Sequence, residues 1–165
     1  MRNVTGIFDS KYKADRAVNK LKSDGFTDND ISLIMSDKTR DAFFGNISDE
    51  TSQVAKSGAA GVVIGGALGA LLAGLTAVGS IVLTGGSVLV AGPIVAVLSG
   101  AGAGGIVGGL SGALISAGFA TDEAYKFEDE VNASKAIVVV HVNDDMREAK
   151  ARAAMSSYGA NTKLA

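Results

Sequence analysis

The sequence has no cysteine and no tryptophan, and it has one proline and one histidine. The lack of cysteine excludes disulfides, thiolate nucleophiles and Cys-based metal sites. A basic excess is also missing, because 15 Lys and Arg residues face 17 Asp and Glu residues and the net charge is −2. We therefore expect no nucleic acid partner. The first residues lack the apolar core of a secretory signal peptide, which favours a cytoplasmic location for the polar part.

Charge itself is absent from one long stretch, residues 57–121, which we call the charge-free segment. It contains no Asp, Glu, Lys, Arg or His, and it holds 18 of the 22 glycines together with Pro93. Most of its other residues are Ala, Val, Leu and Ile. On both sides of this segment, the composition is typical of an ordinary α/β domain.

The residues before the segment predict a βαβ unit. Residues 3–9 alternate as a strand does, and the spacing of the apolar residues then indicates a helix that ends near residue 24. Gly25 suits the left-handed position after a helix. Residues 31–35 form the second predicted strand. The polar residues 37–56 are expected to be a linker.

A second unit follows the segment and repeats the first. Residues 122–133 predict an acidic helix, residues 136–142 a valine-rich strand, and residues 143–158 a capped helix that ends at Gly159. A shift of 134 residues places Val4 on Val138 and Gly25 on Gly159. Two such halves predict an α+β fold of the split βαβ, ferredoxin-like type. Its predicted parts are 1–36, the linker 37–56, the apolar helical hairpin 57–121, and 122–165.

The second face of the predicted sheet is unusually apolar. If Val138 and its alternate neighbours meet the helices, then Ile7, Ile137 and Val139 lie on the other face. We expect this face to contact another subunit or part of the inserted segment, although a small exposed apolar patch would also be tolerated.

Within the charge-free segment we predict two long helices, 55–82 and 93–118. The turn between them is expected at residues 84–87 or at residues 91–93, where Gly and Pro break a helix. A helix of ~25 residues spans the ~30 Å hydrocarbon layer of a bilayer. A hairpin would also return the chain to the side from which it left, so that the two halves can meet.

Seven glycines of the segment form two series in which glycine recurs at every fourth position. Such spacing clears a groove along one helix face, which lets two helices pack closely. This pattern predicts helix-packing and oligomerisation residues, which are Gly61, Gly65, Gly69, Gly100, Gly104, Gly108 and Gly112.

Three interpretations of the segment follow. The hairpin crosses the bacterial inner membrane, with the lipid bilayer as a partner and the α/β domain in the cytoplasm. Alternatively, it forms the buried core of a large homo-oligomer such as a ring, shell or filament. A flexible low-complexity linker is the third interpretation, and the abundance of Val, Leu and Ile disfavours it. Both of the first two make the protein its own partner.

Catalytic chemistry is not indicated. His141 is the only histidine and is expected to have a structural or surface role. The acidic pairs lie at turns and helix starts, where capping explains them, and no nucleophile–base pattern stands out. We predict no enzyme activity, no cofactor and no metal. A small-ligand sensor that uses the sheet is a further, weaker alternative.

Several stretches resemble a known family. The residues Val-Thr-Gly-Ile-Phe-Asp-Ser (4–10), Leu-Lys-Ser-Asp-Gly-Phe (21–26) and Asp-Asn-Asp-Ile-Ser-Leu-Ile (28–34) are similar to the opening of bacterial general stress proteins with a heat-induced stress protein (YflT-type) domain. Those proteins, and the related low-temperature-induced proteins, also have a Gly/Ala-rich centre. The resemblance implies a non-catalytic stress-response protein, and it assigns no catalytic residues.

Overall fold

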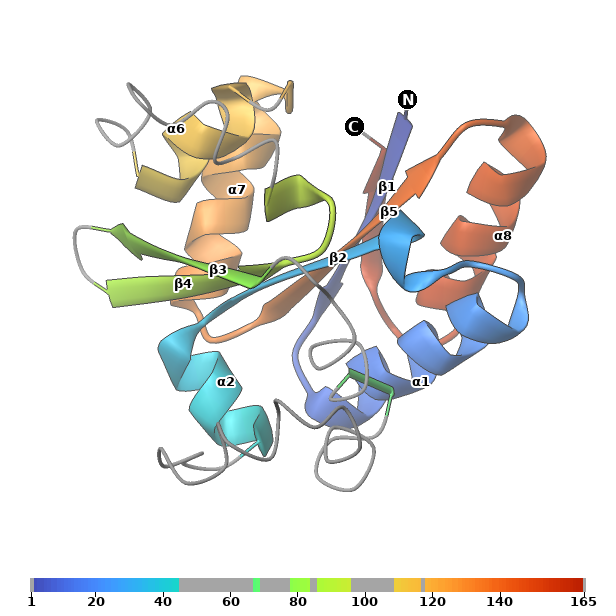
Figure 1. Cartoon of the computed structure of the whole chain (residues 1–165), viewed down its shortest axis with the longest axis horizontal. Helices are drawn as coiled ribbons and strands as arrows, with labels where there is room; N and C mark the ends of the chain where they lie inside the picture. The colour runs from blue at the N-terminus through green and yellow to red at the C-terminus, as the bar shows by residue number, and fades with distance from the viewer. Residues whose placement is uncertain are drawn as a thin grey trace.

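The computed structural model of the chain describes residues 2–44, 67–68, 78–83, 86–95, 109–116 and 118–164. Within these residues the chain is a mixed α+β protein with one antiparallel sheet of six strands in the order β3-β4-β2-β5-β1-β6 (Figure 1). The strands are β1 (Arg2–Phe8), β2 (Ile31–Ser36), β3 (Val78–Leu83), β4 (Gly86–Ala91), β5 (Ala136–Val142) and β6 (Asn161–Leu164). The helices are α1 (Lys11–Ser23), the short 3-10 helix η1 (Asp28–Asp30), α2 (Asp37–Phe44), α6 (Gly109–Ser116), α7 (Thr121–Asn132) and α8 (Asp145–Ser156).

The two terminal halves repeat each other down to their helix caps. The Ser10 side chain accepts a hydrogen bond from the Lys13 backbone N–H at the start of α1. The Asp144 side chain does the same for Arg147 at the start of α8. Both helices are followed by a glycine with positive φ, Gly25 at 94° and Gly159 at 77°. The predicted helix-ending glycines are confirmed, and the cap predicted for the second helix is the Asp144 side chain.

The central strands of the sheet come from the two halves. β1 pairs with β5 in antiparallel register, with Val4 opposite Val140 and Ile7 opposite Ile137. β2 lies on the other side of β5, and β6 on the other side of β1. The strand predicted at 136–142 therefore shares a sheet with the first strand of the chain, as the repeat predicts.

One hydrophobic core lies between the sheet and the pair α1 and α8, which lie side by side on one face (Figure 1). Alternate residues of the three central strands enter this core, because successive side chains of a strand point to opposite faces. Its fully buried members include Val4, Phe8, Ala14, Val18, Leu21, Ile31, Leu33, Val138, Val140, Ala151 and Met155.

A second core covers the opposite face, and α6 and α7 supply its helical layer (Figure 1). Phe119 and Phe127 meet edge to face there, with their ring centroids 5.9 Å apart. Ile137 and Val139 are fully buried in this core, and Ile7 packs against it. The apolar face is thus covered from within the chain, by part of the charge-free segment and by the acidic helix after it. A ligand sensor that uses this face is not supported, since the face is already filled.

The predicted pair of long helices is wrong at residues 78–83 and 86–91, although residues 67–68, 94–95 and 109–116 are helical as predicted. Residues 78–83 and 86–91 are not helical but form the antiparallel strands β3 and β4, which pair with Leu83 opposite Gly86. β4 also pairs with β2, so the hairpin extends the sheet. The physical reason is that Val and Ile suit a pleated surface, whereas frequent glycine disfavours a helix by about 1 kcal/mol per residue.

The transmembrane interpretation is corrected by the same residues. No helix in the described part of the chain is both long enough and apolar enough to cross a bilayer. The membrane-embedded function predicted from the segment is therefore contradicted. The alternative, a hairpin core of a large homo-oligomer, also has no support among these residues. The first eight residues of the expected linker form α2.

Candidate functional site

Three side chains of the α/β domain bind backbone N–H groups of the charge-free segment. The Asp15 carboxylate on α1 accepts from the Leu68 N–H at 2.9 Å. Ser32 Oγ on β2 accepts from the Ile94 N–H at 3.2 Å. The third contact is made by Glu128 on α7, which accepts from the Ser111 N–H at 3.3 Å. We call these three contacts the capping contacts.

Each capping contact meets a residue that lies in a helical stretch of the segment. Residues 67–68 and 94–95 are helical, and Ser111 is the third residue of α6. The first N–H groups of a helix have no partner within the helix and need an acceptor from elsewhere. A carboxylate is a favoured acceptor, because the positive end of the helix dipole lies there. The segment has no Asp or Glu of its own, so two of its acceptors are carboxylates from α1 and α7.

The Ser32 contact is one end of a longer hydrogen-bonded chain. Ser32 Oγ lies 3.0 Å from Nε2 of His141, and Nδ1 of His141 lies 2.8 Å from Oδ1 of Asn3. Since the Ile94 N–H donates to Ser32 Oγ, the Ser32 hydroxyl can donate to Nε2, which leaves the ring proton on Nδ1 for Asn3. The chain thus connects three strands of the sheet to the segment, and its distances are compatible with a neutral His141.

Burial lowers the pKa of His141 below its ordinary value of 6.5, because a charged ring loses its hydration there. The Asp30 carboxylate opposes this shift, since its negative charge favours the imidazolium. Asp30 is itself engaged by the Thr27 backbone N–H at 2.8 Å and by Arg147 at 3.0 Å. The Thr27 hydrogen bonds and Arg147 help to lower the pKa of Asp30, although burial works in the opposite direction. His141 therefore favours the neutral form at neutral pH.

The connectivity Ser32–His141–Asn3 resembles a nucleophile, a base and an orienting amide. The site is nevertheless closed, because Ser32 is fully buried and its Oγ already receives the Ile94 N–H. Gly92 lies against the same serine, and a Cβ built on Gly92 would be 3.0 Å from Ser32 Oγ and 2.4 Å from the Ile31 carbonyl oxygen. A substrate carbonyl has no approach to Ser32 in this arrangement.

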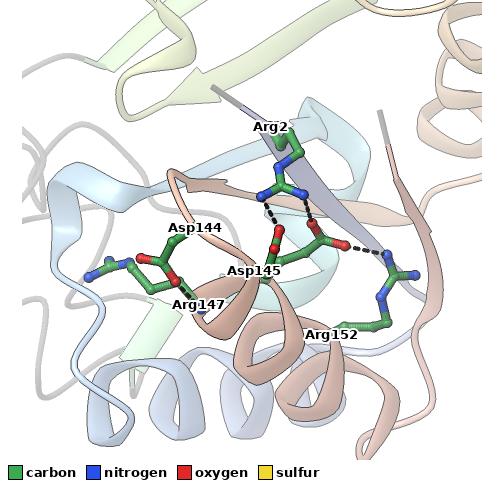
Figure 2. Close-up of polar contacts among 6 residues, drawn as sticks. Arg2, Asp144, Asp145, Arg147 and Arg152 are labelled. Carbon is green, nitrogen blue, oxygen red and sulfur yellow. Dashed lines mark hydrogen bonds and ion pairs between the residues drawn. The ribbon is translucent and has the colours of Figure 1, made fainter.

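A second polar cluster lies at the start of α8, on the other face of the sheet (Figure 2). Arg2, the first described residue of β1, pairs with Asp145 and lies 2.9 Å from Glu148, which also pairs with Arg152 at 3.1 Å. The Asp145 hydrogen bond raises the pKa of Arg2. An open groove of about 490 Å³ runs along these side chains. Each of its four charged groups is paired with another, so the cluster anchors β1 to α8.

Metal and cofactor ligands were not predicted. Over the part of the chain that the structure describes, no three His, Asp or Glu side chains gather as a metal site would require. The acidic pair Asp144 and Asp145 caps α8 and pairs with Arg2, and the pair Asp28 and Asp30 lies in η1.

The predicted packing glycines fall mostly outside the described residues, namely Gly61, Gly65, Gly69, Gly100, Gly104 and Gly108. Gly112 is half-buried on α6. The predicted sheet-face residues Ile7, Ile137 and Val139 all border the second core.

Sequence reasoning missed Asp15, Ser32 and Glu128. One signal could have indicated them: helices in a segment without acids need acceptors from outside it. The partners themselves are 53, 62 and 17 residues away along the chain, so only a tertiary structure could name them.

No family model, no curated protein and no solved structure matches this chain. The resemblance to bacterial general stress proteins therefore stays a prediction.

Proposed function

We propose that this protein is non-enzymatic and that its α/β domain holds the charge-free segment in place through the capping contacts. The observation that carries this proposal is the direction of three hydrogen bonds. Asp15, Ser32 and Glu128 all accept from backbone N–H groups of the segment. Each of these polar side chains therefore already has a hydrogen-bond donor in the segment, and none of them needs a substrate as a partner.

We further propose that the Ser32 contact responds to acid through His141. Protonation adds a hydrogen to Nε2, which then points at Ser32 Oγ from 3.0 Å. Ser32 can no longer donate to the ring, and its Oγ must receive N–H groups from both His141 and Ile94. The buried positive charge also loses hydration. Acid therefore weakens the hydrogen bond from the Ile94 N–H to Ser32, which holds residues 92–95 against the domain.

The sign of the pH dependence follows from the lowered pKa. Below pH 6.5 the unfolded chain binds a proton at His141, while the folded chain resists protonation until a lower pH. The stabilisation by neutral His141 is complete above pH 6.5. It is lost as the pH falls from 6.5 through the folded pKa.

Amide hydrogen exchange tests this proposal, with rates corrected for intrinsic chemistry at about pH 7.5 and about pH 5. We expect the protection of the Ile94 amide to fall severalfold in acid, while the Lys13 amide, capped by Ser10, keeps its protection. His141→Gln cannot take up a proton in this range, so its Ile94 protection should stay constant with pH. An equal acid response of Ile94 in wild type and in His141→Gln contradicts the acid proposal.

The Asp30 carboxylate, which raises the pKa of His141, offers a second test of the acid proposal. Asp30→Asn removes the charge that raises the pKa of His141, so the acid response of Ile94 should move to lower pH. No movement relative to wild type would show that His141 is not the titrating group.

A direct test of the non-enzymatic proposal uses a serine-reactive fluorophosphonate. We expect no covalent labelling of Ser32 in the folded protein, because its hydroxyl is fully buried. Labelling at Ser32 that is lost in His141→Gln would establish an activated nucleophile and overturn the proposal.

For the fold, we propose that the two halves form a ferredoxin-like split βαβ unit. The strand order β6-β1-β5-β2, the antiparallel pairing and the two helices on one face support this proposal. An experimental structure in which β6 pairs with a strand other than β1 would contradict it.

A further inference from the structure

Two tyrosines and an arginine form an exposed cluster where α1 lies beside the end of α8. We propose that this cluster, Tyr12, Arg16 and Tyr158, is a docking site for a carboxylate side chain in an acidic segment of a partner protein. The proposal does not rest on the capping contacts, although Asp15 of those contacts directly precedes Arg16 on α1.

The cluster holds the Arg16 guanidinium against two rings. Its Cζ atom lies 5.9 Å from the centroid of Tyr12 and 5.8 Å from that of Tyr158. Tyr12 is one helical turn before Arg16 on α1, so the two side chains share a face. Tyr158 follows α8, which packs beside α1. Cation–π attraction to the two rings favours this position of the guanidinium and leaves its N–H groups available for an acceptor.

Arg16 differs from the other arginines in having no acidic partner among the described residues. The other four arginines, Arg2, Arg40, Arg147 and Arg152, each pair with an Asp or Glu side chain. Tyr12 is also unusual, because 71% of it is exposed although it is a large aromatic residue. A cation beside one exposed ring and one half-buried ring, with no acidic partner in the described part of the chain, is suited to an incoming ligand.

The chemistry of the cluster favours a carboxylate on a protein. A planar guanidinium matches a planar carboxylate with two parallel hydrogen bonds. Arg and Tyr are also the residues that contribute most at protein–protein interfaces.

The probe for this site is a short blocked peptide, acetyl-Gly-Glu-Glu-Gly-Glu-Glu-amide, at low salt. Titration is followed by NMR at the Arg16 Nε–H and the Tyr12 ring signals. We expect saturable shifts at both. Arg16→Lys keeps the charge but loses the planar fork, so it should weaken binding about fivefold or more. Arg152→Lys is the matched control, because Arg152 is already paired with Glu148, and its binding should equal that of wild type.

Two further titrations distinguish a peptide carboxylate from other ligands. The glutamine version of the peptide and inorganic phosphate should leave the Arg16 signal unmoved at the same concentrations. The proposal is overturned if Arg16→Lys binds the glutamate peptide as tightly as wild type does. It is also overturned if the glutamine peptide or phosphate shifts the Arg16 signal as much as the glutamate peptide does. Tyr12→Leu keeps Arg16 intact, and an unchanged affinity in that variant would show that the ring does not position the guanidinium.

Discussion

The two terminal halves and the charge-free segment differ in where their helix caps come from. In the halves, the side chains of Ser10 and Asp144 each accept a hydrogen bond from a backbone N–H only three residues ahead. The N···O distances are 3.3 and 2.7 Å. In the segment, the caps of Leu68 and Ile94 come from residues that are 53 and 62 positions away. The halves thus specify their helices locally, whereas the segment depends on the assembled domain.

This difference explains how a stretch without charged residues forms part of a folded protein. Its described apolar side chains enter both cores, which gives this part of the segment its burial. Burial leaves backbone N–H groups away from water, and each needs an acceptor. The domain supplies three such acceptors, at Asp15, Ser32 and Glu128. Variants that remove a borrowed cap or a local one test this comparison.

Gly92 should show the largest effect. It has φ of +96°, and an added Cβ would lie 2.4 Å from the Ile31 carbonyl oxygen and 2.8 Å from Ser32 Cα. Gly92→Ala therefore combines backbone strain with a clash against β2, and we expect it to lower the free energy of unfolding by about 3 kcal/mol. Urea denaturation followed by circular dichroism measures this change.

Gly25→Ala is the matched control for Gly92. Gly25 has a similar φ of +94°, but nothing lies within 4 Å of a Cβ built on it. Only the strain remains, so the expected loss is about 1 kcal/mol. Equal losses in the two variants would show that the contact between Gly92 and β2 is unimportant.

Ser32→Ala should rank second. It leaves the buried Ile94 N–H without its acceptor and the part-buried His141 Nε2 without its donor. We expect a loss of about 2 kcal/mol in the free energy of unfolding. Ser10→Ala removes a local cap and should cost about 1 kcal/mol. Hydrogen exchange separates them further, since only Ser32→Ala should expose the Ile94 amide.

Glu128 should show the smallest effect. Glu128→Ala removes the acceptor of the Ser111 N–H, and we expect a loss of about 1 kcal/mol. Glu128→Gln keeps an acceptor oxygen and loses only the charge near the start of α6, which should cost about 0.5 kcal/mol. Asp144→Ala gives the local comparison on α8. If Glu128→Ala leaves both the free energy of unfolding and the amide hydrogen exchange of α6 unchanged, the third capping contact has no energetic role.

Sequence alone was sufficient for the halves because their signals are short-range. The strand alternation, the caps Ser10 and Asp144 and the glycines Gly25 and Gly159 all act within one helix or strand. The pairing of β1 with β5 also followed, since the repeat requires two equivalent strands in one sheet. The hydrogen-bonded series of side chains Asn3, His141 and Ser32 could not be predicted from the sequence, because its members come from three strands.

The charge-free segment was misjudged for a related reason. A run of Val, Ile, Leu and Gly satisfies the pattern of an apolar helix and that of a buried strand equally well. Residues 78–83 and 86–91 became strands because β2 offers an edge with which β4 pairs, and that edge exists only after the sheet has formed. Local sequence therefore determined the two halves and their repeat. The tertiary structure decided the conformation of the described part of the segment, because its pairing partners and helix caps lie far away along the chain.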